Sequence, residues 1–132
     1  MNVVNTIRIF LHLLGVAGWV GGQVLLLGLM PVLRHIDSEA PRIAAERFRR
    51  VAWPCLALAV ITGIWGLAEV DLSVQSDGYL SVLLVKLLLV GASGASAAIH
   101  SNTQSVVLRG ATGAISFMTA LGALFLGSSL VA

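Results

Sequence analysis

The segment Tyr79–Val90 reads YLSVLLVKLLLV and holds a single charged residue, Lys86, among apolar neighbours. Apolar residues continue to Ile99, so the run reaches the length of about 20 residues that a helix needs to cross a bilayer. An ammonium group near the bilayer centre costs about 2.5 kcal/mol or more, so such a lysine is usually paired, ligated or exposed to a polar cavity. Alternatively, its long stem lets the ammonium reach the lipid headgroups.

The composition extends this membrane interpretation to the whole chain of 132 residues, of which 58% are hydrophobic and 11% are charged. A water-soluble domain of this size has no need of so much apolar surface, because its exterior faces water. We expect membrane helices at Thr6–Val32, Val51–Val70, Tyr79–Ile99 and Val106–Val131. The sequence therefore predicts an all-α integral membrane protein, a single domain over residues 1–132, folded as a four-helix up-down bundle in the lipid bilayer.

The connections between these helices predict an orientation. Five arginines lie between Leu33 and Arg50, whereas Ala68–Gly78 holds no lysine or arginine and three acidic residues. By the positive-inside rule the first connection is cytoplasmic. Both termini should then lie on the outer side of the inner (cytoplasmic) membrane. Asp37 or Ser38 should cap a short interfacial helix in the first connection. The basic residues gather at a membrane edge, which argues against a nucleic-acid partner.

A second costly residue, His12, lies in the first helix at a depth that matches Lys86. His12 is about six residues and Lys86 about seven residues from the outer ends of their helices, or roughly 9 and 10 Å. Both helices run in the same direction, so we predict that the two side chains meet. On the first helix, Gly15, Trp19 and Gly22 share the face of His12 at steps of three and four. The alternative for His12 is a hydrogen bond to a neighbouring Ser or Thr.

Small and hydroxyl-bearing residues predict how the helices pack. Glycine and alanine gather at Gly18–Gly22, Gly91–Ala95 and Gly110–Ala114, where they favour close helix contact, although they also leave room for a flat cofactor. The same faces offer contacts for a homo-oligomer or a larger membrane complex. Hydroxyl groups within the apolar runs should form hydrogen bonds between helices; they belong to Thr62, Ser93, Ser96, Thr112, Ser116 and Thr119.

Four segments together resemble the CopD-like copper-resistance membrane domain: LHLLGVAGWVGG (Leu11–Gly22), RFRR (Arg47–Arg50), ITG (Ile61–Gly63) and GYLSVLLVKLLLV (Gly78–Val90). The same landmarks are similar to the HemJ-type protoporphyrinogen oxidases, which are linked to b-type haem. That resemblance implies a functional pair formed by the first-helix histidine and the third-helix lysine, here His12 and Lys86. HemJ-type proteins carry Pro-Arg-Leu soon after the tryptophan, whereas this chain has MPVLR later, so it stands nearer the CopD-like domain.

The ligands present favour haem over the copper that the family name implies. Copper(I) prefers thiolate and thioether ligands, and here these are scattered at Cys55, Met1, Met30 and Met118. Haem iron needs only one or two axial ligands and an apolar pocket. We therefore expect a haem b site with His12 and Lys86 on the metal and Gly15, Trp19, Gly22 and Arg8 around the cofactor, Arg8 next to a propionate.

The leading hypothesis is thus a haem-binding membrane protein for electron transfer or oxidoreduction. A protein for copper transport or copper tolerance is the alternative, and an accessory subunit of a larger membrane complex is the second alternative. Whether the protein is an enzyme stays open. So does a second metal or haem site between His35 and His100.

Overall fold

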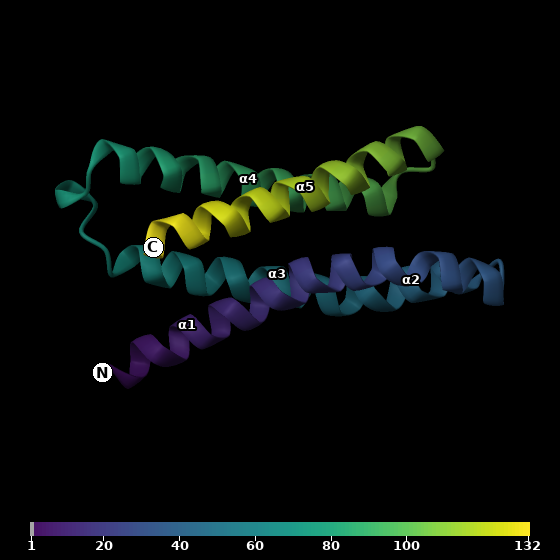
Figure 1. The fold of residues 1–132 in the computed structure, drawn as a ribbon, viewed down its shortest axis with the longest axis horizontal. Helices are drawn as coiled ribbons and strands as arrows, with labels where there is room; N and C mark the ends of the chain where they lie inside the picture. Colours follow the sequence, from purple (N-terminus) through teal and green to yellow (C-terminus); the bar gives the residue numbers. More distant parts are fainter. Residues whose placement is uncertain (1) are drawn as a thin grey trace. The chain divides into compact units, whose positions relative to one another are not determined.

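The computed structural model describes residues 2–132 and confirms the all-α class. Four helices are long and apolar enough to cross a membrane, and no strand occurs among the described residues. The protein is therefore a multi-pass membrane protein. The chain divides into two compact units, one ending at Val70 and the other starting at Asp71, and each consists of a pair of long helices (Figure 1).

In the first unit the opening helix is continuous but not regular. It comprises α1 (Val3–Val16), the π-helical turn η1 (Ala17–Gly21) and α2 (Gly22–Ile36). The Asn2 side chain caps α1 by accepting hydrogen bonds from backbone N–H groups of the first turn. A π-helical turn interrupts the regular hydrogen-bond ladder and is a known cause of helix kinks, and the helix axis bends there in Figure 1.

The partner helix α3 (Ala40–Ala68) differs from the sequence prediction. We expected a second membrane helix from Val51 and a separate interfacial helix before it, but α3 runs unbroken through the arginine-rich segment. Alanine, glutamate and arginine favour helix there, and Arg42 bonds Glu39 and Glu46, at 2.7 and 2.9 Å, along the same helix face. Hydropathy indicates where the apolar part of a helix ends. The helix itself can extend further when the polar residues beyond that point also favour helix.

The helices of this unit pack antiparallel. Gly15 lies against the backbone of Ala59, and further along the first helix Gly22 lies against the Phe48 ring. Residue numbers therefore increase along the first helix in the direction in which they decrease along α3, so the two helices run in opposite directions. The three-residue connection Asp37–Glu39 closes the pair, with the Asp37 carboxylate accepting a 2.7 Å hydrogen bond from the Glu39 backbone N–H.

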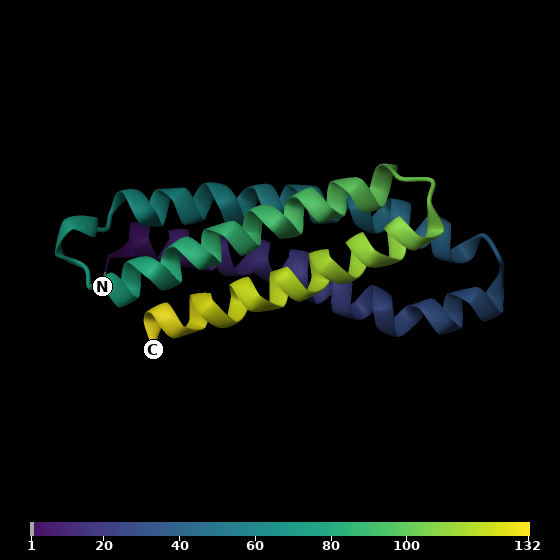
Figure 2. The same cartoon turned by 90° about the horizontal axis from the view of Figure 1, so that it is seen from above.

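The second unit is an antiparallel pair of equal helices, α4 (Asp77–Asn102) and α5 (Val106–Val131), preceded by the short 3-10 turn η2 (Leu72–Val74). The two helices lie side by side in Figure 2. At their centre Ser93 Oγ donates to Ser116 O at 2.8 Å and Ser116 Oγ donates back to Ser93 O at 2.9 Å, with both residues buried. The expected hydrogen bonds between helices are confirmed at this pair.

Candidate functional site

The His12 side chain faces α3, and its contacts determine which ring nitrogen carries hydrogen. Nδ1 lies 2.9 Å from Ala59 O and 3.1 Å from Thr62 Oγ1. A carbonyl oxygen can only accept, so Nδ1 is the N–H donor. The Thr62 hydroxyl lies 2.6 Å from the Leu58 carbonyl and donates to it, so it too accepts from the imidazole. In the neutral ring the lone pair is then on Nε2.

This arrangement is the one that metal-ligating histidines show. Such a histidine commonly donates its other ring N–H to a backbone carbonyl, which holds the ring plane and makes the ligating nitrogen more basic. Thr62 is 2% exposed, so the acceptor side of the contact is fixed inside the hairpin. The sequence left open whether His12 bonds a hydroxyl or ligates a metal; the bond to Thr62 uses Nδ1 alone and is compatible with either role.

The small residues beside His12 form the contact between α1 and α3. An ideal Cβ placed on Gly15 would lie 2.6 Å from Cys55 O and 2.7 Å from Ala59 N. At Gly22 the corresponding space is filled by the Phe48 ring. Both positions are therefore closely packed against α3, and their expected place beside a cofactor stays a prediction.

Trp19, expected on the same face, is 6% exposed and packs against Trp53. The ring centroids lie 5.4 Å apart with an interplanar angle of 55°. This tilted geometry is one that aromatic pairs favour. The pair joins the π-helical turn η1 to α3, so Trp19 contributes to the rigidity of the helix pair that holds His12.

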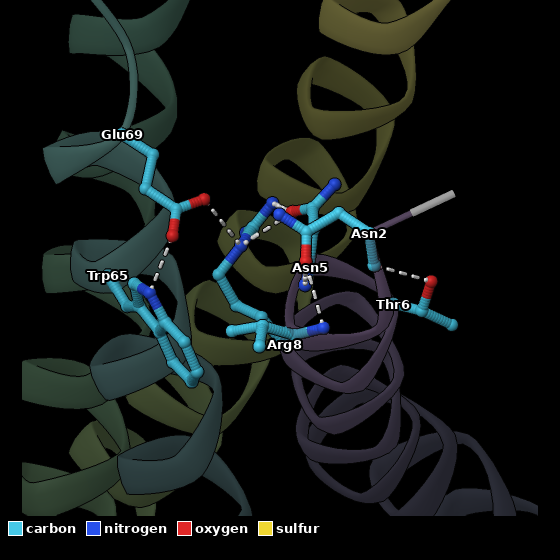
Figure 3. A network of polar contacts seen from close by, with 7 residues as sticks. Asn2, Asn5, Thr6, Arg8, Trp65 and Glu69 are labelled. Atoms are coloured by element: carbon cyan, nitrogen blue, oxygen red, sulfur yellow. Dashed lines mark hydrogen bonds and ion pairs between the residues drawn. The ribbon is translucent and has the colours of Figure 1, made fainter.

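Arg8 lies one turn from His12, and its guanidinium is held by a polar network (Figure 3). Its Nε and Nη2 donate to Asn5 Oδ1 at 3.1 and 2.7 Å, and Nε lies 3.7 Å from Glu69 Oε2. Glu69 also accepts a 2.8 Å hydrogen bond from Trp65 Nε1. The Arg8 guanidinium lies against Gly66, where any larger residue would place its Cβ in the space that the guanidinium occupies. A haem propionate at Arg8 would therefore compete with Glu69.

Lys86 is half-buried on α4, and its stem lies against α5. An ideal Cβ on Gly127 would lie 3.2 Å from Nζ and 3.4 Å from Cε, so the glycine makes room for the lysine. Within residues 71–132 the ammonium forms no hydrogen bond or ion pair. His12 and Lys86 belong to different units, so their convergence on one metal stays a prediction.

Sequence reasoning missed the partners of these residues. It did not identify Ala59 and Thr62 for His12, Glu69 for Arg8, or Gly127 for Lys86. One signal was available: in antiparallel helices joined by a short connection, a residue near one free end lies level with a residue near the other. Arg8 and Glu69 occupy such positions, and their charges are opposite.

The other candidate ligands do not form a cluster in the part of the chain that the structure describes. Among residues 2–132, no group of three or more His, Cys, Asp or Glu side chains could hold a metal ion. His100 Nδ1 lies 2.7 Å from Arg109 O and links α4 to α5, whereas His35 is exposed on α2. A second site between these two histidines stays a prediction. No protein-family model, curated protein or solved structure matches this chain.

Proposed function

We propose that this multi-pass protein of the inner membrane is CopD-like, binds b-type haem through His12 and functions in electron transfer or oxidoreduction. The observation that supports this best is the hydrogen bond from His12 Nδ1–H to the Ala59 carbonyl. It orients the imidazole and places the lone pair on Nε2, the atom that would bond to the iron. When bound, the haem would supply one-electron redox chemistry.

Lys86 is the proposed second axial ligand. A lysine in an apolar helix needs a partner, and its own hairpin, residues 71–132, supplies neither an acid nor a hydrogen-bond acceptor to the ammonium. Ligation would require the neutral amine, which metal binding favours by displacing the proton.

An absorption spectrum tests the proposal directly. The full chain, produced in cells supplied with a haem precursor and purified in mild detergent, should show a Soret band. On reduction it should show the α and β bands of a low-spin b-type haem. A colourless protein from cells in which a known haem protein is fully loaded would contradict haem binding, and Lys86 would then be a lysine whose ammonium reaches the headgroups.

Copper transport is tested through the scattered sulfur ligands. Met30 and Met118 lie in different units, and Cys55 packs against Gly18 in the helix contact. We expect Met30→Leu and Met118→Leu to leave haem content and cellular copper accumulation unchanged, because a single thioether is a poor copper site. Copper content of cells, measured with and without the protein, provides the readout. Loss of protein-dependent copper accumulation in either variant would place copper ahead of haem.

The predicted orientation can be tested with cysteines in the two connections. In a Cys55→Ala background, Ser76→Cys should react with an impermeant thiol reagent on intact cells and Ser38→Cys should not. Both side chains are exposed, so accessibility to solvent does not separate them. Opening the cells should make both positions reactive, which controls for local reactivity. The reverse pattern on intact cells would place the arginine-rich connection outside.

A further inference from the structure

The opening helix is longer than a membrane span requires. It covers Val3–Ile36, 34 residues, or about 50 Å at 1.5 Å per residue, whereas about 20 residues cross the hydrocarbon core. Its partner α3 is free of charge only from Val51 to Ala68, about 27 Å by the same rise. The uncharged part of α3 is thus close in length to the hydrocarbon core, and the hairpin continues past it towards the Asp37–Glu39 connection.

We call this continuation the hairpin end; it consists of α2 and the segment Ala40–Arg50 of α3. Gly22 meets the Phe48 ring and only three residues join the helices, so α2 runs alongside Ala40–Arg50. Unlike its partner, α2 carries no charge before Arg34. Its large apolar side chains are between 44% and 71% exposed at Val24, Leu25, Leu27, Leu29, Val32 and Ile36. The hairpin end therefore combines an uncovered apolar helix with a charged one.

The charges of the hairpin end are divided between paired and unpaired arginines. Arg42 is held by two carboxylates, at 2.7 Å from Glu39, the residue that precedes α3, and at 2.9 Å from Glu46 on α3. Arg34 is exposed in the last turn of α2, next to the connection, and forms no ion pair within residues 2–70. Arg47, Arg49 and Arg50 of α3 are also exposed, and none of them forms an ion pair within the same residues. These three guanidinium groups stand next to Val51, where the apolar part of α3 begins.

We propose that the hairpin end lies in the membrane interface and binds the phosphate groups of anionic phospholipids through Arg47, Arg49 and Arg50. The apolar side chains of α2 would then contact lipid, those nearest the arginines meeting the upper acyl chains. Guanidinium groups bind phosphate with paired hydrogen bonds, and basic residues beside a membrane helix attract anionic headgroups. A phospholipid matches both halves of the surface, whereas a free phosphate would leave α2 uncovered. This inference is independent of haem binding.

Lipid selectivity measures the arginine contribution. The full chain is reconstituted in phosphatidylcholine with trace spin-labelled phosphatidylglycerol or phosphatidylcholine, and the motionally restricted fraction of each label gives the selectivity. Wild type should prefer phosphatidylglycerol, and the triple variant Arg47→Gln, Arg49→Gln, Arg50→Gln should lose the preference. Each arginine contributes up to about fivefold, the equivalent of about 1 kcal/mol. Equal selectivity in the triple variant and wild type would overturn the proposal.

A charge-neutral variant is the matched control. Arg42→Gln with Glu46→Gln removes one arginine together with its carboxylate partner, so the net charge of the hairpin end is unchanged. This protein should select phosphatidylglycerol as wild type does. Loss of selectivity here would mean that Arg47, Arg49 and Arg50 are not the binding groups. Replacing chloride by inorganic phosphate at equal ionic strength should leave selectivity intact; abolition by phosphate alone would indicate a soluble anion site and overturn the lipid assignment.

The position of α2 is tested separately. A fluorophore on Leu29→Cys, in a Cys55→Ala background, should be quenched by lipids that carry a nitroxide high on the acyl chain. A label on Ser38→Cys, in the connection, should be quenched less. Absence of quenching at position 29 would show that α2 faces water or another protein, and the membrane placement of the hairpin end would be wrong.

Discussion

The His12→Ala protein should purify with little or no haem, while wild type retains it. The substitution removes the imidazole whose Nδ1–H is held by Ala59 O at 2.9 Å and whose Nε2 is the proposed axial ligand. Thr62→Val should weaken binding by roughly 10-fold or more, because it removes an acceptor of the same N–H while leaving the ligand. Haem per protein, measured by pyridine haemochrome absorbance against amino-acid analysis, provides the number.

The matched control is His100→Ala. This histidine is also partly buried, and its Nδ1 lies 2.7 Å from a backbone carbonyl, that of Arg109, in the other unit. The His100→Ala protein should keep its haem. A loss of haem confined to His12→Ala would then identify His12 as the ligand, because removing an imidazole elsewhere has no such effect. Helix content by circular dichroism should be equal in both variants. Equal haem loss in both would contradict His12 as the axial ligand.

Variants of Lys86 distinguish ligation from a headgroup contact. Lys86→Met should retain some haem but shift its spectrum and raise its potential, because a thioether ligand favours the reduced iron relative to nitrogen. Lys86→Arg should not restore the wild-type spectrum, because guanidinium stays protonated and has no lone pair for the metal. A wild-type spectrum and potential in both variants would mean that Lys86 does not bind the iron.

The sequence predicted the fold class well because the physical signal is strong. A run such as Tyr79–Ile99 is too apolar and too long for a soluble helix, and the same argument holds for the other three runs. The helix boundaries were less accurate at Ala40–Arg50, where the residues are polar but still favour helix. Hydropathy alone cannot distinguish a polar loop from a helix that continues into the interface.

Side-chain pairing was harder to predict than helix number. His12 could be placed on a face of the first helix, but its bond to Thr62 depends on the rotation and register of α3, which the sequence does not encode locally. Arg8 was expected next to a propionate, which stays a prediction, and the sequence analysis did not identify Glu69, which lies 3.7 Å from its guanidinium. The predicted convergence of His12 and Lys86 rests on the similar depth of the two residues in the membrane and on the shared direction of their helices. Depth and direction do not determine whether the two helices are neighbours.

Gly15→Ala should cause the largest loss of stability among single glycine substitutions in the first helix. Its Cβ would lie 2.6 Å from Cys55 O and 2.7 Å from Ala59 N, and these are backbone atoms of a helix, which cannot rotate aside. The two helices would have to separate, weakening the contact that holds His12. Overpacking of this kind costs about 1–3 kcal/mol, and Gly15→Val should cost more. Unfolding in dodecyl sulfate, followed by circular dichroism, measures the loss.

Glycines elsewhere on the same helix provide a graded series. Gly28 has no atom within 4 Å of an ideal Cβ, so Gly28→Ala should be neutral or stabilising by up to about 1 kcal/mol. Gly22→Ala meets only the Phe48 side chain, which can change rotamer, so its loss should be intermediate. If Gly15→Ala were as stable as Gly28→Ala but lost its haem, Gly15 would line the cofactor instead of the α3 contact. Equal stability and equal haem content would mean that α1 and α3 pack less closely at Gly15 than these distances require.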